Sequence, residues 1–229
     1  MVKYGALDPP DERSPWESWF AWYPVWTAAG ERLWLRRTQR RWLTRQRARI
    51  RDYRLLRVPD WRDADAYSPL WDARAAAAAQ LVPAGTSVLD LGCGPRQALR
   101  TLLPAGCRYF PADMTKWNDE TILVDLDKGE YPEGRHDVTV ALGVLCYLHD
   151  PARVLRQAAL RSSTLIVSFT HPRLWESRRG RQRRGWINHY SHAEFCRLLN
   201  SAGWTVVEEH RDESPLRHRT IIYRAQISV

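Results

Sequence analysis

The chain has 229 residues, of which 44% are hydrophobic and 27% charged, so it is long enough to bury a core of ordinary size. This composition excludes a disordered tail and a disulfide-stapled mini-protein. No stretch approaches the roughly 18 consecutive apolar residues of a membrane span, and residues 1–15 lack the apolar core of a signal peptide. We therefore expect a soluble cytoplasmic protein without a membrane partner.

Positive charge is concentrated near the N-terminus. Residues 31–57 contain eleven arginines and two acids, and so hold the whole formal excess of nine positive charges. Seven of the twelve tryptophans fall within the first 61 residues. We expect a basic, aromatic N-terminal module (residues 1–60) joined to an electrically balanced domain (residues 61–229).

Within this module, residues 18–37 predict an aromatic hairpin that turns at Gly30. Residues 37–56 have apolar side chains at about helical spacing with arginines between them, which predicts a basic amphipathic helix. Arginines interleaved with tryptophans suit phosphate contact and base stacking. Residues 31–57 are therefore a candidate site for a nucleic acid or a protein partner, and the exposed rings would also suit a homo-oligomer.

After a linker at residues 58–66, strands and helices alternate. Helices are expected at residues 69–82, near 95–103, at 151–160 and at 191–203. Strands are expected at residues 87–94, where the run ends in glycines, and at 107–113, 121–126, 137–143, 164–170, 204–210 and 219–227. This alternation predicts an α/β fold with a parallel sheet and helices on its faces. Because no helix separates the last two strands, the last strand should be antiparallel.

The strongest motif is Val-Leu-Asp-Leu-Gly-Cys-Gly at residues 88–94. Gly92 and Gly94 let the backbone turn sharply at the end of a strand and approach a ligand closely. Asp90 precedes these glycines, and Asp113 ends the next strand, where a carboxylate can accept both hydroxyls of a ribose. The alternative is that the two acids cap turns. The four cysteines, which lack CxxC spacing, support neither a zinc site nor a disulfide framework.

Residues 66–229 resemble the class I S-adenosylmethionine-dependent methyltransferases. Leu-Asp-Leu-Gly-Cys-Gly is similar to the first motif of that family, Ala-Asp-Met (112–114) to its ribose-binding acid, and Val-Asp-Leu-Asp (124–127) to its adenine segment. Residues 141–151 are similar to its fourth-strand motif. The resemblance implies a Rossmann-like, doubly wound, mostly parallel seven-stranded sheet with S-adenosyl-L-methionine as cofactor.

The resemblance also implies roles for single residues. Asp90, Gly92 and Gly94 would surround the methionine part of the cofactor and Asp113 its ribose. Asp125 and Leu126 would contact the adenine, and Leu142 and Gly143 would form the inner wall.

Two features near this site depart from the methyltransferase pattern, and a third observation bears on the alternative family. Arg96 stands where the methyltransferase family commonly has a third glycine, so it would either clamp the carboxylate of the cofactor or narrow the pocket. The connection between the second and third strands is too short for the usual helix, which would leave the adenine side open. A nicotinamide dehydrogenase fits less well, because the third glycine of GxGxxG would fall at Gln97.

Methyl transfer from a sulfonium depends mainly on proximity, and a base is needed only for a hydroxyl or a protonated amine acceptor. His171, just after the fifth strand, is the first candidate for that base, and His149 beside Tyr147 is the second. For both histidines a structural role is the alternative. Trp186, together with His189 and Tyr190, could form a lid, or this segment could simply lead into a helix cap near Ser191.

The sequence indicates the class of methyl acceptor less directly than it indicates the cofactor. Residues 173–184 form a second basic patch, which suits an anionic substrate. The chain has neither the [DN]PP[YF] motif nor the PC dipeptide of enzymes that methylate DNA bases, and residues 141–151 look more like enzymes acting on small metabolites, sugars or lipids. We therefore expect methyl transfer to O or N of a small-molecule or saccharide acceptor. RNA or protein methylation and a non-enzymatic scaffold are the alternatives.

Overall fold

The computed structural model describes residues 60–67, 71–172, 178–182, 185–211 and 220–228. All of these belong to one compact unit, residues 57–229. The aromatic hairpin and the basic helix expected within residues 1–60 lie outside the described residues. Among the helices that are described, none has the length and apolar character to cross a membrane.

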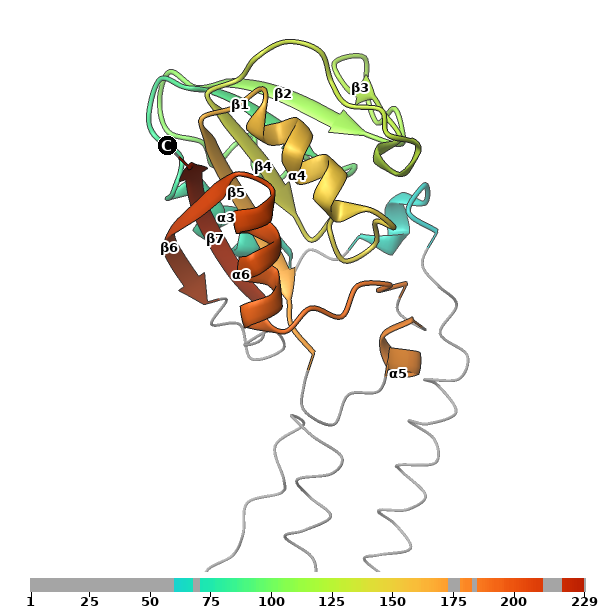
Figure 1. Cartoon of the computed structure of the whole chain (residues 1–229). Coiled ribbons are helices and arrows are strands. Elements are labelled where there is room, and N and C mark those ends of the chain that lie inside the picture. The colour runs from blue at the N-terminus through green and yellow to red at the C-terminus, as the bar shows by residue number, and fades with distance from the viewer. Residues whose placement is uncertain (1–59, 68–70, 173–177, 183–184, 212–219, 229) are drawn as a thin grey trace, which may run out of the picture. The chain divides into compact units, whose positions relative to one another are not determined.

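The core of this unit is a seven-stranded sheet with the order β3-β2-β1-β4-β5-β7-β6 (Figure 1). The strands are β1 (Ser87–Leu91), β2 (Arg108–Asp113), β3 (Ile122–Leu123), β4 (Val138–Leu142), β5 (Thr164–Thr170), β6 (Trp204–Arg211) and β7 (Thr220–Ile227). Only β7 runs antiparallel to its neighbours β5 and β6. The predicted mostly parallel sheet with an antiparallel last strand is confirmed.

The described helices are η1 (Ala64–Ala66), α3 (Asp72–Ala79), η3 (Leu126–Lys128), α4 (Pro151–Ala159), α5 (Arg178–Gln182) and α6 (His192–Ser201). Four of them, η1, η3, α4 and α6, begin at a residue whose side chain caps the helix, whereas α3 begins without a side-chain cap. The Asp150 side chain accepts from the backbone N–H of Arg153 at the start of α4, and Pro151 occupies its first position. Ser191 and Glu194 form a capping box at the start of α6, so the cap near Ser191 is confirmed.

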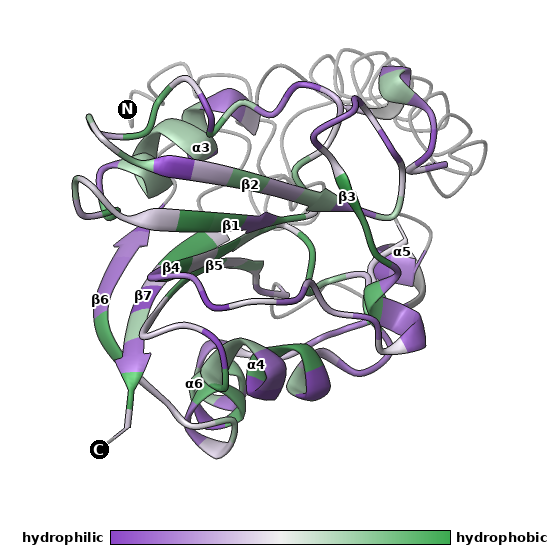
Figure 2. Ribbon diagram, turned by 90° about the horizontal axis from the view of Figure 1, so that it is seen from above, coloured by the Kyte–Doolittle hydropathy of each residue, from purple (hydrophilic) through white to green (hydrophobic). Residues whose placement is uncertain are grey.

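Along the five inner strands, side chains alternate between two apolar clusters, one on each face of the sheet. One cluster joins Leu89 and Val167 to residues of α4 and α6, among them Phe195. The other joins Val88 and Ile166 to the alanines of α3. Figure 2 shows α3 on one side of the sheet and α4 and α6 on the other. Helices thus cover both faces, as a doubly wound sheet requires.

The helix predicted near residues 95–103 is wrong, because this segment is a series of turns. Gln97 adopts the left-handed conformation, with φ of 43°, which interrupts a right-handed helix. The N–H groups of Arg100 and Leu102 each bond to a carbonyl three residues back. The chain therefore leaves β1 through irregular backbone.

The third strand is also shorter than expected, since Asp125 caps η3 instead of continuing the strand.

Candidate cofactor-binding site

The glycine turn lies at the carboxyl end of β1, in the middle of the sheet. Gly92 and Gly94 have φ of 71° and 66°, which residues with a side chain rarely adopt. The N–H groups of Gly92 and Cys93 donate to the carbonyl of Ala112 over 2.7 and 3.2 Å. A Cβ on Gly92 would overlap a methyl group of Val144. The turn therefore needs glycine both for its conformation and for its close packing.

Asp113, the last residue of β2, lies directly against this turn. One of its carboxylate oxygens accepts from the N–H of Gly94 over 2.9 Å, and the other accepts from the N–H of Thr115 over 3.1 Å. The carboxylate is buried, and each oxygen keeps a further lone pair. The fold thus brings the predicted ribose acid to the glycine turn, where it also fixes the turn to β2.

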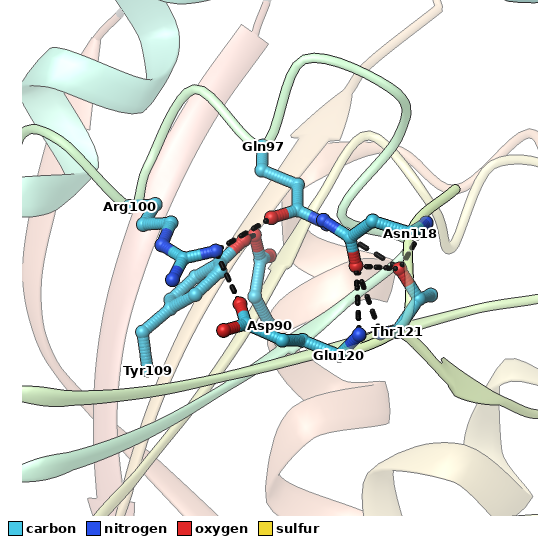
Figure 3. A network of polar contacts seen from close by, with 7 residues as sticks. All are labelled: Asp90, Gln97, Arg100, Tyr109, Asn118, Glu120 and Thr121. Carbon is cyan, nitrogen blue, oxygen red and sulfur yellow. Dashed lines mark hydrogen bonds and ion pairs between the residues drawn. The ribbon is translucent and has the colours of Figure 1, made fainter. Parts of the chain in front are cut away.

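Asp90 is the buried acid of β1 and lies at one end of a polar network, which it joins through Tyr109 (Figure 3). It accepts a hydrogen bond of 2.7 Å from the hydroxyl of Tyr109 on β2. Burial, with a smaller contribution from Asp113, raises the pKa of Asp90 to about 6, although the bond from Tyr109 and the nearby Arg74 favour the charged form. Such a carboxylate would gain from a cationic ligand.

Gln97 extends this network to the loop between β2 and β3, as Figure 3 shows. Its buried amide donates to the hydroxyl of Thr121 over 3.4 Å, and its carbonyl oxygen accepts from Arg100 over 3.5 Å. Arg100 also pairs with Glu120. Side-chain contacts therefore connect the turns after β1 to the β2–β3 loop in place of the expected helix.

Arg96, the arginine predicted to contact the cofactor, and Arg74, which the sequence did not single out, lie in different environments. The side chain of Arg96 is half exposed, and its guanidinium bonds to Asp72 over 2.5 Å. Arg74 of α3 is instead buried and approaches the end of β4, where a Cβ on Gly143 would lie 2.7 Å from its Nη1 atom. Sequence reasoning missed Arg74 because it lies within an alanine-rich helix that gave no sign of a ligand.

The residues assigned to adenine and to the inner wall lie beyond β3 and at the end of β4. The Asp125 side chain accepts from the N–H of Asp127, and hydrogen bonding to Lys128 lowers the pKa of Asp125. Leu126 is buried. Leu142 ends β4, and Gly143 follows it with φ of 76° and donates its N–H to the hydroxyl of Ser168 over 2.8 Å.

Five aromatic side chains pack beside the glycine turn and form what we call the aromatic cluster. They are Trp61, Tyr67, Trp71, Trp117 and Tyr147, whose rings contact one another at centroid distances of 4.6–6.0 Å. A Cβ on Gly94 would lie 2.7 Å from the ring of Tyr67, so this ring covers the turn directly. Trp61 lies within the predicted linker, and no sequence pattern singles out Tyr67.

The predicted catalytic residues occupy three different environments. The hydroxyl of Tyr147 accepts a bond of 2.8 Å from Trp186. His149 is exposed, and its Nδ1 atom lies 3.0 Å from a carboxylate oxygen of Asp127. His171 is buried among aromatic rings, away from solvent.

Both ring nitrogens of His171 have partners. Nδ1 lies 3.0 Å from the carbonyl oxygen of Tyr190, so it must carry the proton, and Nε2 accepts from the hydroxyl of Tyr223 over 2.6 Å. Burial lowers the pKa of His171, with further contributions from His192 and Arg181. The assignment of His171 as a base stays a prediction, but its lone pair is already engaged in this structure.

This environment predicts a pH effect on stability. Because the pKa of His171 is lower in the folded than in the unfolded chain, the unfolded chain takes up the proton first as the pH falls below about 6.5. The stabilising contribution of His171 should therefore decrease on acidification from pH 7.5 to 5.5, so the wild type should lose stability relative to a His171→Gln variant over this range. Urea unfolding across this range measures the difference. Parallel pH profiles of the two proteins would contradict the assignment.

Comparison with known proteins agrees with this arrangement. Residues 36–209 match the family described as the methyltransferase domain, which is more than half of the chain. The chain belongs to this methyltransferase family. Its cofactor is therefore S-adenosylmethionine, as the resemblance implied. No curated protein matches the sequence at a significant level.

Solved structures of methyltransferases share the fold of this methyltransferase. CcbJ from Streptomyces caelestis is 18% identical, with a TM-score of 0.54 over 72% of this chain and 92% of its own. The 1,6-didemethyltoxoflavin-N1-methyltransferase of Burkholderia thailandensis is 19% identical, with a TM-score of 0.54 over 70% and 82%. A chain in the complex of the Haloferax volcanii Trm112 activator with a putative methyltransferase is 20% identical, with a TM-score of 0.54 over 69% and 90%.

Proposed function

We propose that this methyltransferase binds S-adenosylmethionine over the glycine turn of β1, with its polar groups matched to three buried side chains. Arg74 would face the carboxylate, Asp90 the ammonium group and Asp113 the ribose hydroxyls. When bound, the cofactor supplies a methyl group already activated on a sulfonium. The fit is supported by three positive-φ glycines, Gly92, Gly94 and Gly143, and by the raised pKa of the buried Asp90.

The Asp113→Ala variant tests the ribose assignment. Loss of a charge-assisted hydrogen-bond partner should cost about 1.5–3 kcal/mol of binding free energy. S-adenosylhomocysteine should therefore raise the melting temperature of the wild type, and calorimetric titration should show roughly 10–150-fold weaker binding to the variant.

Asp119→Ala is the matched control, because the Asp119 carboxylate is fully exposed in the loop after β2 and pairs only loosely with Lys116 over 3.8 Å. This variant should bind S-adenosylhomocysteine like the wild type. Equal affinity in a folded Asp113→Ala variant would refute the assignment of Asp113.

We propose that the methyl acceptor is a small molecule or saccharide methylated at O or N. The aromatic cluster is the observation that supports this proposal. Rings beside the cofactor turn can stack on a planar ring or on the apolar face of a sugar. Proximity and alignment against these rings would supply most of the rate. The proposal agrees with the Burkholderia thailandensis enzyme, whose structure holds 1,6-didemethyltoxoflavin.

Where the acceptor needs deprotonation, we infer that His149 is better placed than His171. The carboxylate of Asp127 orients its Nδ1 atom over 3.0 Å, and the side chain is exposed, so Nε2 can accept a proton. The pairing of a base with an orienting carboxylate follows the logic of catalytic triads. His171, in contrast, would first have to release the hydroxyl of Tyr223.

A transfer experiment distinguishes the acceptor classes. The full-length protein is incubated with S-adenosylmethionine labelled on its methyl group and a cell extract separated into low-mass, RNA and protein fractions. We expect label in the low-mass fraction, and none with Asp113→Ala. Label that is released only by ribonuclease or protease would overturn the small-molecule proposal.

RNA is the second candidate acceptor, and the charge of residues 31–57 favours it. Eleven arginines in this segment could contact phosphates, and such binding weakens steeply as the salt concentration rises. A protein or nucleic-acid partner that only positions the enzyme would use the same segment. RNA-dependent labelling that disappears at high salt would support this reading.

A further inference from the structure

His192, Cys196 and Glu209 gather on the outer part of the sheet, away from the glycine turn of β1. His192 and Cys196 lie one turn apart on α6, so their side chains share a face of that helix. Glu209 lies on β6, the edge strand that packs beside α6. One ligand atom from each residue falls within a set whose members lie within 4.8 Å of one another.

The distances among these atoms are close to those around a tetrahedral metal ion. The Nε2 atom of His192 lies 2.8 and 3.0 Å from the two carboxylate oxygens of Glu209. The Sγ atom of Cys196 lies 3.8 Å from Nε2 and 3.9 Å from Oε1. Around zinc, bond lengths of about 2.0–2.3 Å separate such ligand atoms by roughly 3.4–3.6 Å. Shifts of about 0.6 Å or less would complete the geometry.

The imidazole of His192 is also held in place. It stacks on the ring of Tyr223 with an interplanar angle of 27° and meets the ring of His171 edge-on. The side chains of His192 and Glu209 are 49% and 38% exposed, so an ion could enter from solvent. A simple surface ion pair would need only His192 and Glu209. Here the thiol of Cys196 also lies close to both of them, which gives a third potential metal ligand.

We propose that His192, Cys196 and Glu209 form a zinc-binding site whose fourth position is open to water. Imidazole and thiolate with one carboxylate favour zinc over magnesium or calcium, which prefer oxygen ligands. On binding, the S–H bond of Cys196 breaks, a Zn–S bond forms and the proton passes to solvent. The ion remains Zn²⁺ throughout. It would join the start of α6 to β6 without touching the cofactor turn.

The test uses the untagged full-length protein, reduced and stripped of metal. Zinc is titrated in competition with a chromophoric chelator, and we expect saturation at one tight site with release of about one proton per ion at a pH where the thiol is protonated. Cys196→Ser and Glu209→Gln should weaken binding by more than the roughly 10–100-fold that loss of an outer partner costs. Magnesium should not compete.

Two variants serve as matched controls. Cys107→Ser removes another half-buried thiol, and His149→Gln removes another histidine paired with a carboxylate. Both should bind zinc like the wild type. Cobalt(II) provides a second readout, since its thiolate charge-transfer absorption should be lost in Cys196→Ser and kept in the controls.

The proposal is overturned if the wild type binds no zinc, or if folded Glu209→Gln binds as tightly as the wild type. Circular dichroism and thermal melting establish folding before each titration. If Cys196→Ser does not fold, Glu209→Gln decides, because its side chain is exposed. None of these measurements uses the methyl donor, so their result is independent of the proposed methyl transfer.

Discussion

Replacing Asp90 by asparagine should stabilise the unliganded protein at neutral pH and abolish its binding of S-adenosylhomocysteine. The pKa of about 6 means that the folded state disfavours the charged carboxylate relative to the unfolded chain, where the value is near 3.8. A shift of this size corresponds to about 3 kcal/mol. Asparagine removes the buried charge and can still accept the bond from Tyr109.

The gain in stability should depend on pH with a defined sign. Between about pH 4 and pH 6 the folded chain holds a proton on Asp90 that the unfolded chain has lost, so the wild type loses stability as the pH rises. The advantage of Asp90→Asn should therefore be largest above pH 6 and vanish near pH 4. His171 acts in the opposite direction below about pH 6.5, so the variant must be compared with the wild type at each pH.

Urea unfolding from pH 4 to pH 8, with titration of S-adenosylhomocysteine at pH 7.5, measures both parts of this prediction. Asp119→Asn is the control, because its carboxylate is fully exposed and should leave stability and binding almost unchanged. An Asp90→Asn variant less stable than the wild type at pH 7.5 would show that the charge is compensated in the folded state. Undiminished binding would show that Asp90 does not face the cofactor.

Gly92→Ala should destabilise the fold and weaken cofactor binding together. An alanine at φ of 71° costs roughly 1–2 kcal/mol from backbone strain alone. Its Cβ would also overlap a methyl group of Val144, so either this side chain or the turn must move. Any shift of the turn would in addition strain the bond from Gly94 to Asp113.

Two further variants separate these contributions. Gly85 has a similar φ of 75°, and a Cβ added there would meet no other atom within 4 Å, so Gly85→Ala reports the backbone cost alone. The double variant Gly92→Ala/Val144→Ala relieves the overlap. It should therefore recover the part of the lost stability that is due to packing. Urea unfolding and calorimetric titration measure both effects. If Gly92→Ala lowers the free energy of unfolding no more than Gly85→Ala does, the close packing against Val144 is unimportant.

The parts of the fold that sequence predicted rest on local patterns. Apolar runs predicted the strands, and the cap near Ser191 marked the start of α6. The convergence of Asp113 on Gly94 followed because neighbouring parallel strands end at the same edge of a sheet. The antiparallel last strand followed from the missing helix before it.

The parts that sequence missed depend on contacts between distant residues. A helix was expected after the glycine turn, but Gln97 takes a left-handed conformation and its amide reaches the β2–β3 loop. Arg74 and Tyr67 gave no local sign of their position. The cluster of His192, Cys196 and Glu209 required the placement of β6 beside α6, which residue spacing does not reveal.

The two outer strands of the sheet limit how this protein could associate with itself. At one edge β3 has only two residues, too few to offer a continuous row of free backbone groups. At the other edge β6 ends in four exposed polar residues, Glu208 to Arg211, which resist stacking against a second strand. Short and charged edges are the features by which sheets avoid growing from one molecule into the next. Within the part of the chain that the structure describes, this sheet is therefore poorly suited to continue into a second copy, and a dimer built on these residues would rely on side-chain contacts between surfaces.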